Sequence, residues 1–377
     1  MKGKGKNKTM KKKLLLFLAL AVVSACAISG CTKKDNLDGN LVPNNGVTDT
    51  DKNGTDSETD DIPELPEAVL TEDDKEIVMN IGGNDISKAE LAFYLLNYKE
   101  VYGGTDSEVW ESAAIKEIKT NAAIKSLAAT NSVSLSEEVK KANVDDIIAQ
   151  TINRYSEEEG SDYQTELKNL HLTDSLFRKI QEDMVLQAVL YNEAYRTEGG
   201  NNFNVNDSDI LDYVHENYVR VKHILIKTVD LDDEQKAEAR TRADKILSDA
   251  RGGTSFEDLV NEYSEDGMDV ETGYYFTQGE MVQEFENASF ALDIDEISDI
   301  VESTYGYHII KRYDMDDSYI LSDETLRAAA LDKICLENYI ADLNETAESL
   351  TGEYSDNYEA VVAEILAEAD NSAEADE

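Results

Sequence analysis

Apolar residues recur at every third or fourth position through much of residues 73–215, which is the spacing of amphipathic helices. The segment SKAELAFYLLNYKEVY opens at Ser87, and Glu90 three residues later completes the pattern of a capping box. A second helical segment, TDSLFRKIQEDMVLQAVLYNEAYR, opens at Thr173. We therefore predict an N-terminal helical domain over 73–215, which begins with a short strand and turn near 75–85.

The pattern changes at Val219, where apolar and polar residues begin to alternate as in a β-strand. Cap residues then mark two helices, since Asp232 begins one that runs to about Arg251 and Ser255 begins the next. We predict a compact α+β unit over 217–315, built from a strand at 219–227, these two helices, a short strand near 274–276, a helix around 283–291 and a strand at 305–313.

After this unit, the helical spacing returns. Residues 320–349 carry one amphipathic pattern and are predicted to form a single helix. Residues 350–377 end in AEADNSAEADE and are predicted to form a frayed, acidic tail.

The N-terminus has the pattern of an export signal. Seven lysines and no acid lie in residues 1–13, and the apolar run LLLFLALAVVSACAISG fills 14–30. The run ends in ISGC at Cys31, which resembles a bacterial lipobox, although VSAC at Cys26 fits almost as well. We prefer Cys31 because the chain becomes polar directly after it, and an uncleaved membrane anchor is the alternative.

Residues 31–72 would then form a lipidated cysteine and a flexible tether. This stretch is rich in Asp, Asn, Thr and Gly, and it contains all three prolines of the chain, Pro43, Pro63 and Pro66. Beyond the signal and Cys31, Cys335 is the one remaining cysteine, so no internal disulfide can form. Its place in a helical pattern predicts a buried, apolar role.

The charge excludes one class of partner. The chain has 35 basic and 80 acidic residues, a net charge of −45, and loss of the seven signal lysines would lower it to −52. Nucleic acid is therefore excluded as a partner, because binding to phosphates requires a basic surface. Such a surface attracts basic polypeptides and divalent cations instead.

Two of the four histidines lie in predicted strands. His223 shares a strand face with Val221 and Leu225, while His308 shares a face with Gly306 and Ile310. If the two strands are neighbours, both imidazoles point into one interior, and we expect the missing side chain of Gly306 to leave room for them.

The order of motifs around these histidines resembles a parvulin-type peptidyl-prolyl isomerase domain. The motifs run VKHILI, FEDLVNEYSED, GYYFTQGEMVQEF, ASFAL and EISDIVESTYGYHII, and together they cover about 219–314. With the lipobox, tether and flanking helices, the chain resembles the PrsA-type foldase lipoproteins and, more distantly, the SurA-type chaperones. The resemblance implies a small antiparallel sheet surrounded by helices, inserted into an all-α chaperone domain.

The resemblance also implies the site. It assigns the two central histidines to His223 and His308, the Cys-or-Asp position to Asp266, and a common threonine position to Ser303. The apolar wall that holds the proline ring would be Met281 and Phe285, which are four residues apart and would share one face of a helix. Thr272 and Tyr305 are the further candidate substrate-binding residues. The loop 267–273 is about three residues shorter than is usual in the family, and Thr272 stands where the family has a pocket leucine.

These residue types suit isomerisation of X-Pro bonds. Rotation must break amide resonance, a barrier of about 18–20 kcal/mol, and no covalent bond to the enzyme is needed. The predicted function is a membrane-anchored isomerase and foldase that needs no cofactor or metal. The alternatives are a non-catalytic holdase, a Ser-His-Asp hydrolase, a His-His-Asp metal site and a solute-binding or adhesive lipoprotein.

The predicted partners and location follow from the same resemblance. The partners would be unfolded or nascent secreted polypeptides that contain X-Pro bonds, the membrane through the lipid on Cys31, and a second copy bound through the helical domain. The protein would lie on the outer face of the cell membrane of a Gram-positive-type bacterium.

Overall fold

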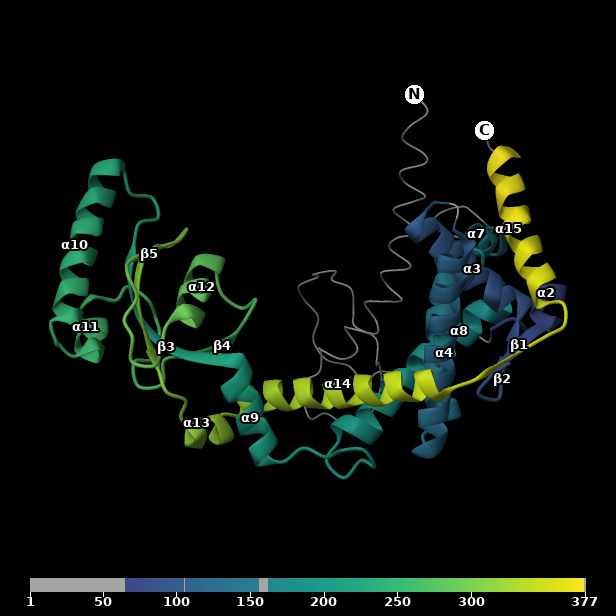
Figure 1. Ribbon diagram of the computed structural model, residues 1–377, viewed down its shortest axis with the longest axis horizontal. Helices are drawn as coiled ribbons and strands as arrows, with labels where there is room; N and C mark the ends of the chain where they lie inside the picture. The colour runs from purple at the N-terminus through teal and green to yellow at the C-terminus, as the bar shows by residue number, and fades with distance from the viewer. Residues whose placement is uncertain (1–64, 105, 156–161, 376–377) are drawn as a thin grey trace. The chain divides into compact units, whose positions relative to one another are not determined.

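The computed structural model describes residues 65–104, 106–155 and 162–375. The predicted signal, Cys26, Cys31 and the tether up to residue 64 lie outside the described residues. The chain divides into two compact units (Figure 1). The central unit, Val205–Ile334, is continuous in sequence. The helical unit joins the chain before Val205 to the chain from Cys335 onward.

A four-stranded antiparallel sheet forms the middle of the central unit. Its strands are β3 (Tyr218–Lys227), β4 (Tyr274–Thr277), β5 (Val301–Glu302) and β6 (Gly306–Tyr313), in the order β4-β3-β6-β5. The long central strands β3 and β6 pair along almost their whole length. The predicted α+β class and the three predicted strands are confirmed, and β5 is an additional two-residue strand.

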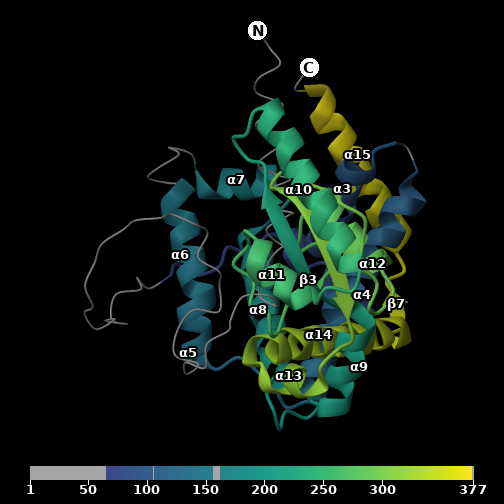
Figure 2. The same ribbon diagram turned by 90° about the vertical axis from the view of Figure 1, so that its left-hand side faces the viewer.

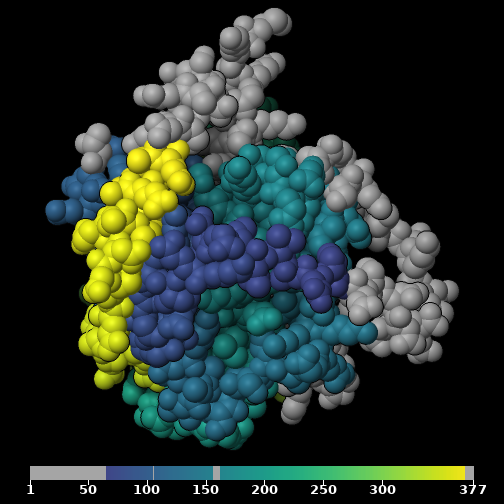
Figure 3. Space-filling model, turned by 90° about the vertical axis from the view of Figure 1, so that its right-hand side faces the viewer, coloured from purple at the N-terminus to yellow at the C-terminus, as the bar shows by residue number. Residues whose placement is uncertain are grey.

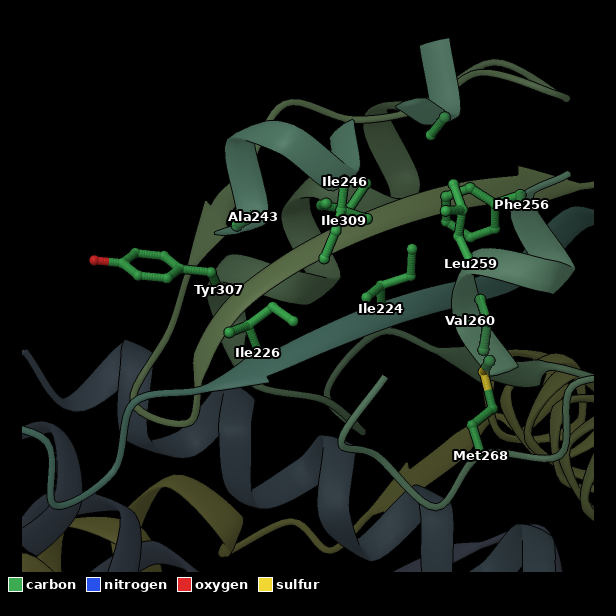
Figure 4. Close-up of a cluster of buried hydrophobic side chains, with 11 residues drawn as sticks. Ile224, Ile226, Ala243, Ile246, Phe256, Leu259, Val260, Met268, Tyr307 and Ile309 are labelled. Carbon is green, nitrogen blue, oxygen red and sulfur yellow. The ribbon is translucent and has the colours of Figure 1, made fainter. Parts of the chain in front are cut away.

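Helices cover both faces of this sheet, as the two ribbon views show (Figures 1 and 2). One face packs against α10 (Asp233–Arg251) and α11 (Phe256–Tyr263), and the other against α12 (Gln283–Ala291). Ile224 and Ile309 of the central strands are fully buried under α10 and α11 (Figure 4). The predicted caps are confirmed, because Asp232 and Ser255 each accept a backbone N–H of the first helical turn.

Three further helical segments complete the unit. They are α9 (Asp207–Asn217), α13 (Asp317–Ser322) and the first part of α14 (Glu324–Ser349), and they share a cluster of buried residues that includes Ile210, Val214, Ile320 and Leu326. The unit therefore extends beyond the predicted parvulin-like segment on both sides. The predicted domain limits of 73–215, 217–315 and 320–349 stay predictions.

The helical unit also contains a sheet, which includes the short strand predicted near 75–85 and two strands that were not predicted. Its strands are β1 (Ile77–Ile81), β2 (Asn84–Ser87) and β7 (Gly352–Tyr354), in the antiparallel order β2-β1-β7. Its helical segments before α9 are α2 (Glu72–Lys75), α3 (Lys88–Tyr102), α4 (Ser107–Thr130), α5 (Glu137–Val139), η1 (Lys140–Asp145), α6 (Asp146–Asn153), α7 (Tyr163–Asn169), α8 (Asp174–Leu190) and η3 (Tyr191–Arg196).

The predicted capping box at the start of α3 forms only in part. Ser87 Oγ accepts the backbone N–H of Glu90, as expected. The Glu90 carboxylate, however, binds Lys179 of α8 instead of returning to the cap. Because Glu90 is only 4 % exposed, an ion pair across two helices is the interaction that offsets burial of its charge.

The prediction of a frayed acidic tail over 350–377 is wrong. Gly352–Tyr354 forms β7, and Tyr358–Ala375 forms the helix α15. Val361, Val362 and Ile365 on α15 are buried, and the yellow C-terminal helix lies against the purple and blue segments of the same unit (Figure 3). The many acidic residues of this segment led to the prediction of a tail, although its apolar residues have the spacing of an amphipathic helix.

None of the helices within the described residues has the length and apolar character needed to cross a membrane.

Candidate active site

The two strand histidines meet on the face of the sheet that α12 covers. In the β3–β6 register His223 lies opposite Ile310 and His308 lies opposite Leu225, so the histidines are diagonal neighbours on one face. Their Nδ1 atoms are 3.2 Å apart, and the rings stack with centroids 5.4 Å apart. With exposures of 3 % and 4 %, both imidazoles are buried. The expected convergence of the two side chains is present in the structure.

Asp266 completes one end of this arrangement. It lies in the loop after α11, which the backbone N–H of Glu265 ties to the carbonyl of Leu225 on β3 at 2.9 Å. Its Oδ2 lies 2.9 Å from Nε2 of His223. The hydrogen bond from His223 is the main cause that holds the pKa of Asp266 well below its usual range, so the carboxyl is ionised at neutral pH.

Ser303 completes the other end. It lies in the turn between β5 and β6, where its Oγ is 2.7 Å from Nε2 of His308. The same oxygen accepts the backbone N–H of Tyr305 at 3.1 Å. The Tyr305 ring itself is 54 % exposed, and its contact with a substrate stays a prediction.

Gly306 is required at the start of β6 by the close approach of the neighbouring strand. Its φ is +147°, and a Cβ at this position would lie 2.1 Å from the carbonyl oxygen of Ile226 on the neighbouring strand. The missing side chain therefore allows β6 to approach the backbone of β3 closely. The expectation that it leaves room for the imidazoles is wrong.

With both imidazoles neutral, the end groups set the direction of each hydrogen bond in the chain of residues Asp266, His223, His308 and Ser303. An ionised Asp266 can only accept, so a neutral His223 donates from Nε2–H and its Nδ1 is an acceptor. Nδ1–H of neutral His308 then donates to His223, which leaves its Nε2 to accept the hydroxyl hydrogen of Ser303. Burial, followed by the nearby His223, lowers the pKa of His308 to about 4, so it is neutral at pH 7.

The predicted apolar wall is present in part. Phe285 of α12 packs edge-on against both imidazoles, with ring centroids 4.9 Å from His223 and 5.3 Å from His308. Met281 precedes α12, which begins at Gln283, so it does not share a helical face with Phe285. Met281 is half-buried and packs against the same apolar cluster, which leaves part of its side chain accessible to a ligand.

The shortened loop 267–273 is held tightly, but not through the side chain of Thr272. The Thr272 carbonyl accepts Nε–H of Arg220 at 3.0 Å, and its backbone N–H is directed to Asp269. The apolar side chain that the loop buries is Met268, which packs with the cluster under α10 and α11. A substrate contact by Thr272 therefore remains a prediction.

Tyr274, the first residue of β4, was not predicted as a site residue. Its hydroxyl donates to Oδ2 of Asp266 at 2.7 Å, the same oxygen that binds His223. The pair of aromatic residues in GYYF is present in the sequence, but nothing local in it shows that the first ring reaches the carboxylate. Pairing of Tyr274 with Val221 on β3 places the ring beside the histidines.

In the part of the chain that the structure describes, no three His, Cys, Asp or Glu side chains are arranged to hold a metal ion. The four ring nitrogens of His223 and His308 all lie within hydrogen-bonding distance of other members of the site. The arrangement therefore places a line of hydrogen-bonded polar groups next to an apolar wall.

Comparison with known proteins identifies this region. Residues 210–315 match the family described as the PPIC-type PPIASE domain. Foldase protein PrsA of Halalkalibacterium halodurans is 35% identical over 155 residues, which are 40% of this chain and 37% of the relative. Foldase protein PrsA 1 of Bacillus cereus is 42% identical over 108 residues, 27% of this chain and 34% of the relative. The matches thus span little more than a third of each relative's length.

The crystal structure of peptidylprolyl isomerase (PrsA) from Bacillus cereus is 20% identical and aligns with 75% of this chain and 95% of its own, at a TM-score of 0.30. The family match and the curated relatives confirm the resemblance drawn from the sequence. Residues 210–315 are therefore a parvulin-type peptidyl-prolyl isomerase domain, carried by a chain that is similar to the PrsA foldases.

Proposed function

We propose that this chain is an extracytoplasmic peptidyl-prolyl isomerase and foldase that assists the folding of secreted polypeptides. One observation carries the proposal. Within the matched domain, Asp266, His223, His308 and Ser303 form one continuous line of hydrogen bonds beside Phe285 and Met281. The relatives named foldase protein PrsA support the same function.

The geometry suits a reaction that forms no covalent bond to the enzyme. In the twisted amide the nitrogen loses conjugation, and the hydrogen-bonding demand of the carbonyl changes. Met281 would hold the proline ring on the apolar side, while Ser303 and the imidazoles would supply fixed dipoles on the other. A rate gain of about 10⁴ requires about 5.5 kcal/mol of differential stabilisation, which a few preorganised contacts can supply.

The second candidate function is a holdase that binds unfolded chains without catalysis. The observation in its favour is the short 267–273 loop, where Thr272 replaces an apolar residue and directs its backbone to Arg220 and Asp269. A weakened pocket would bind proline-containing segments and release them unchanged.

A protease-coupled assay on proline tetrapeptides separates the two candidates, with a chain that starts at residue 32. We expect catalysis above the uncatalysed rate, and His308→Ala or Asp266→Ala should reduce it while the fold is retained. The matched control is His215→Ala, because His215 lies in the same unit, is largely exposed and binds Asp317. A wild-type rate equal to the uncatalysed one would leave the holdase as the function.

We also propose that Cys31 carries a lipid that anchors the protein to the outer face of a Gram-positive-type membrane. The support is the lipobox-like ISGC sequence after an apolar run. Labelling of cells with a fatty-acid analogue should mark the wild type and Cys26→Ser but not Cys31→Ser. A homodimer through the helical unit is proposed from the family resemblance, and analytical ultracentrifugation tests it.

A further inference from the structure

We propose that Tyr274 is a positioning residue of the isomerase site, which orients Asp266 and thereby sets the direction of the hydrogen bonds that end at Ser303. This inference rests on the proposed isomerase function. Its basis is one contact, in which Tyr274 Oη and His223 Nε2 donate to the same Oδ2 atom of Asp266, at 2.7 Å and 2.9 Å.

The orientation of Asp266 matters because its carboxylate is the acceptor that keeps the hydrogen on Nε2 of His223. If the carboxylate turns away, His223 is free to carry its hydrogen on Nδ1. Two Nδ1–H groups would then oppose each other across 3.2 Å, unless His308 also changes tautomer. The hydroxyl of Ser303 would in that case lose its acceptor on His308.

Few other groups hold this carboxylate. Asp266 is only half-buried, and the remaining donor that acts on its charge is the backbone N–H of Gly267. Within the part of the chain that the structure describes, Tyr274 and His223 are the two side chains that donate to this carboxylate. Burial and the bond to Asp266 raise the pKa of Tyr274 to about 12, so the phenol remains a donor at all physiological pH values.

The backbone places Tyr274 with little freedom. Gly273 precedes it with φ of +75°, and a Cβ on Gly273 would lie 2.6 Å from the carbonyl oxygen of Val221. The short loop thus presses directly against β3, and the ladder pair of Tyr274 with Val221 fixes the side of the sheet on which the ring lies. The close approach of Gly273 and the pairing of Tyr274 with Val221 thus hold the phenol within reach of Asp266.

The test is Tyr274→Phe in the mature chain, which removes the hydroxyl and keeps the ring. The matched control is Tyr275→Phe, the next residue on β4, whose hydroxyl accepts the backbone N–H of Asp316 outside the site. We expect Tyr274→Phe to lower kcat/KM on proline tetrapeptides about tenfold, the effect of losing a hydrogen bond to a charged group. Tyr275→Phe should retain the wild-type value, and both variants should retain the wild-type circular dichroism spectrum.

Two further readouts separate positioning from a structural role. Two-bond ¹H–¹⁵N spectra should show the hydrogen of His223 on Nε2 in the wild type and mixed between the nitrogens in Tyr274→Phe. In an Asp266→Ala background, Tyr274→Phe should cause no further loss of activity, because its effect passes through Asp266. Unchanged spectra, or additive losses, would overturn the inference. An inactive wild type would refute the isomerase function, while the spectra would still decide whether Tyr274 orients the histidines.

Discussion

A buried histidine is costly for a protein to charge, and this site contains two in contact. His308 is 4 % exposed, its Nδ1 faces His223, and its Nε2 faces a hydroxyl. A proton on His308 would bury a cation beside the second imidazole of the site. Asp266, on the far side of His223, offsets part of that cost. The neutral form is therefore part of the folded structure and gives stability a specific dependence on pH.

The first prediction concerns that dependence. The pKa of His308 is lowered to about 4 in the folded chain, against 6.5 for an unperturbed histidine, so between these pH values the unfolded chain binds more protons. The stabilisation is fully present above pH 6.5 and is lost as the pH falls to about 4. Urea unfolding across this range should show a smaller pH slope for His308→Gln, by at most about 1.4 kcal/mol per pH unit. Equal slopes would contradict a buried, neutral His308.

At the level of residues, the sequence predicted those members of the site that lie in the motifs found in order along 219–314. His223, Asp266, Ser303 and His308 were identified, and the structure joins them in one hydrogen-bonded line. Tyr274 was missed because its role depends on the path of a shortened loop. The role of Gly306 was misread for a similar reason, since the backbone it approaches belongs to a strand about eighty residues earlier in the sequence.

At the level of elements, helix starts could be predicted from cap residues near in sequence. The β7 strand depends on pairing with a residue range far away in the sequence. Asp232 and Ser255 were recognised as caps because a side chain and a nearby backbone N–H suffice to make one. The third strand of the small sheet, β7, pairs with β1 across more than 270 residues, so no local sequence pattern predicts it. The same distance explains why α15 was taken for a tail.

The second prediction tests α15 as a packed element of the helical unit. Ile365 is 3 % exposed, and Glu364 beside it pairs with Lys88 at 2.9 Å, so the helix contributes both apolar burial and a partner for a buried amine. Ile365→Ala should lower the free energy of unfolding by about 3 kcal/mol, as for a large-to-small change in a core. The matched control, Glu368→Ala on the exposed side of α15, should change it by less than about 0.5 kcal/mol. Equal stability of both variants would restore the view of a frayed tail.

At the level of the whole molecule, the net charge of −45 attracts basic polypeptides. Long-range attraction of this kind raises encounter rates and is screened by salt. The charge therefore supports a client-binding role for either proposed function, and it does not distinguish isomerase from holdase.

The last prediction concerns how the chain folds. No proline occurs after Pro66, so neither unit contains an X-Pro bond beyond its first described residues. Slow refolding phases of tens of seconds commonly come from such bonds, because their isomerisation barrier is about 20 kcal/mol. Refolding of either unit therefore has no X-Pro isomerisation to wait for beyond Pro66.

Double-jump refolding of the mature chain should accordingly show the same rates after short and long unfolding delays, and added cyclophilin should not accelerate any phase. The matched control is Pro66→Ala, which removes the proline nearest the folded part and should leave the kinetics unchanged. A slow phase that grows with the unfolding delay, and that persists in Pro66→Ala, would show that another slow step limits the folding of one unit.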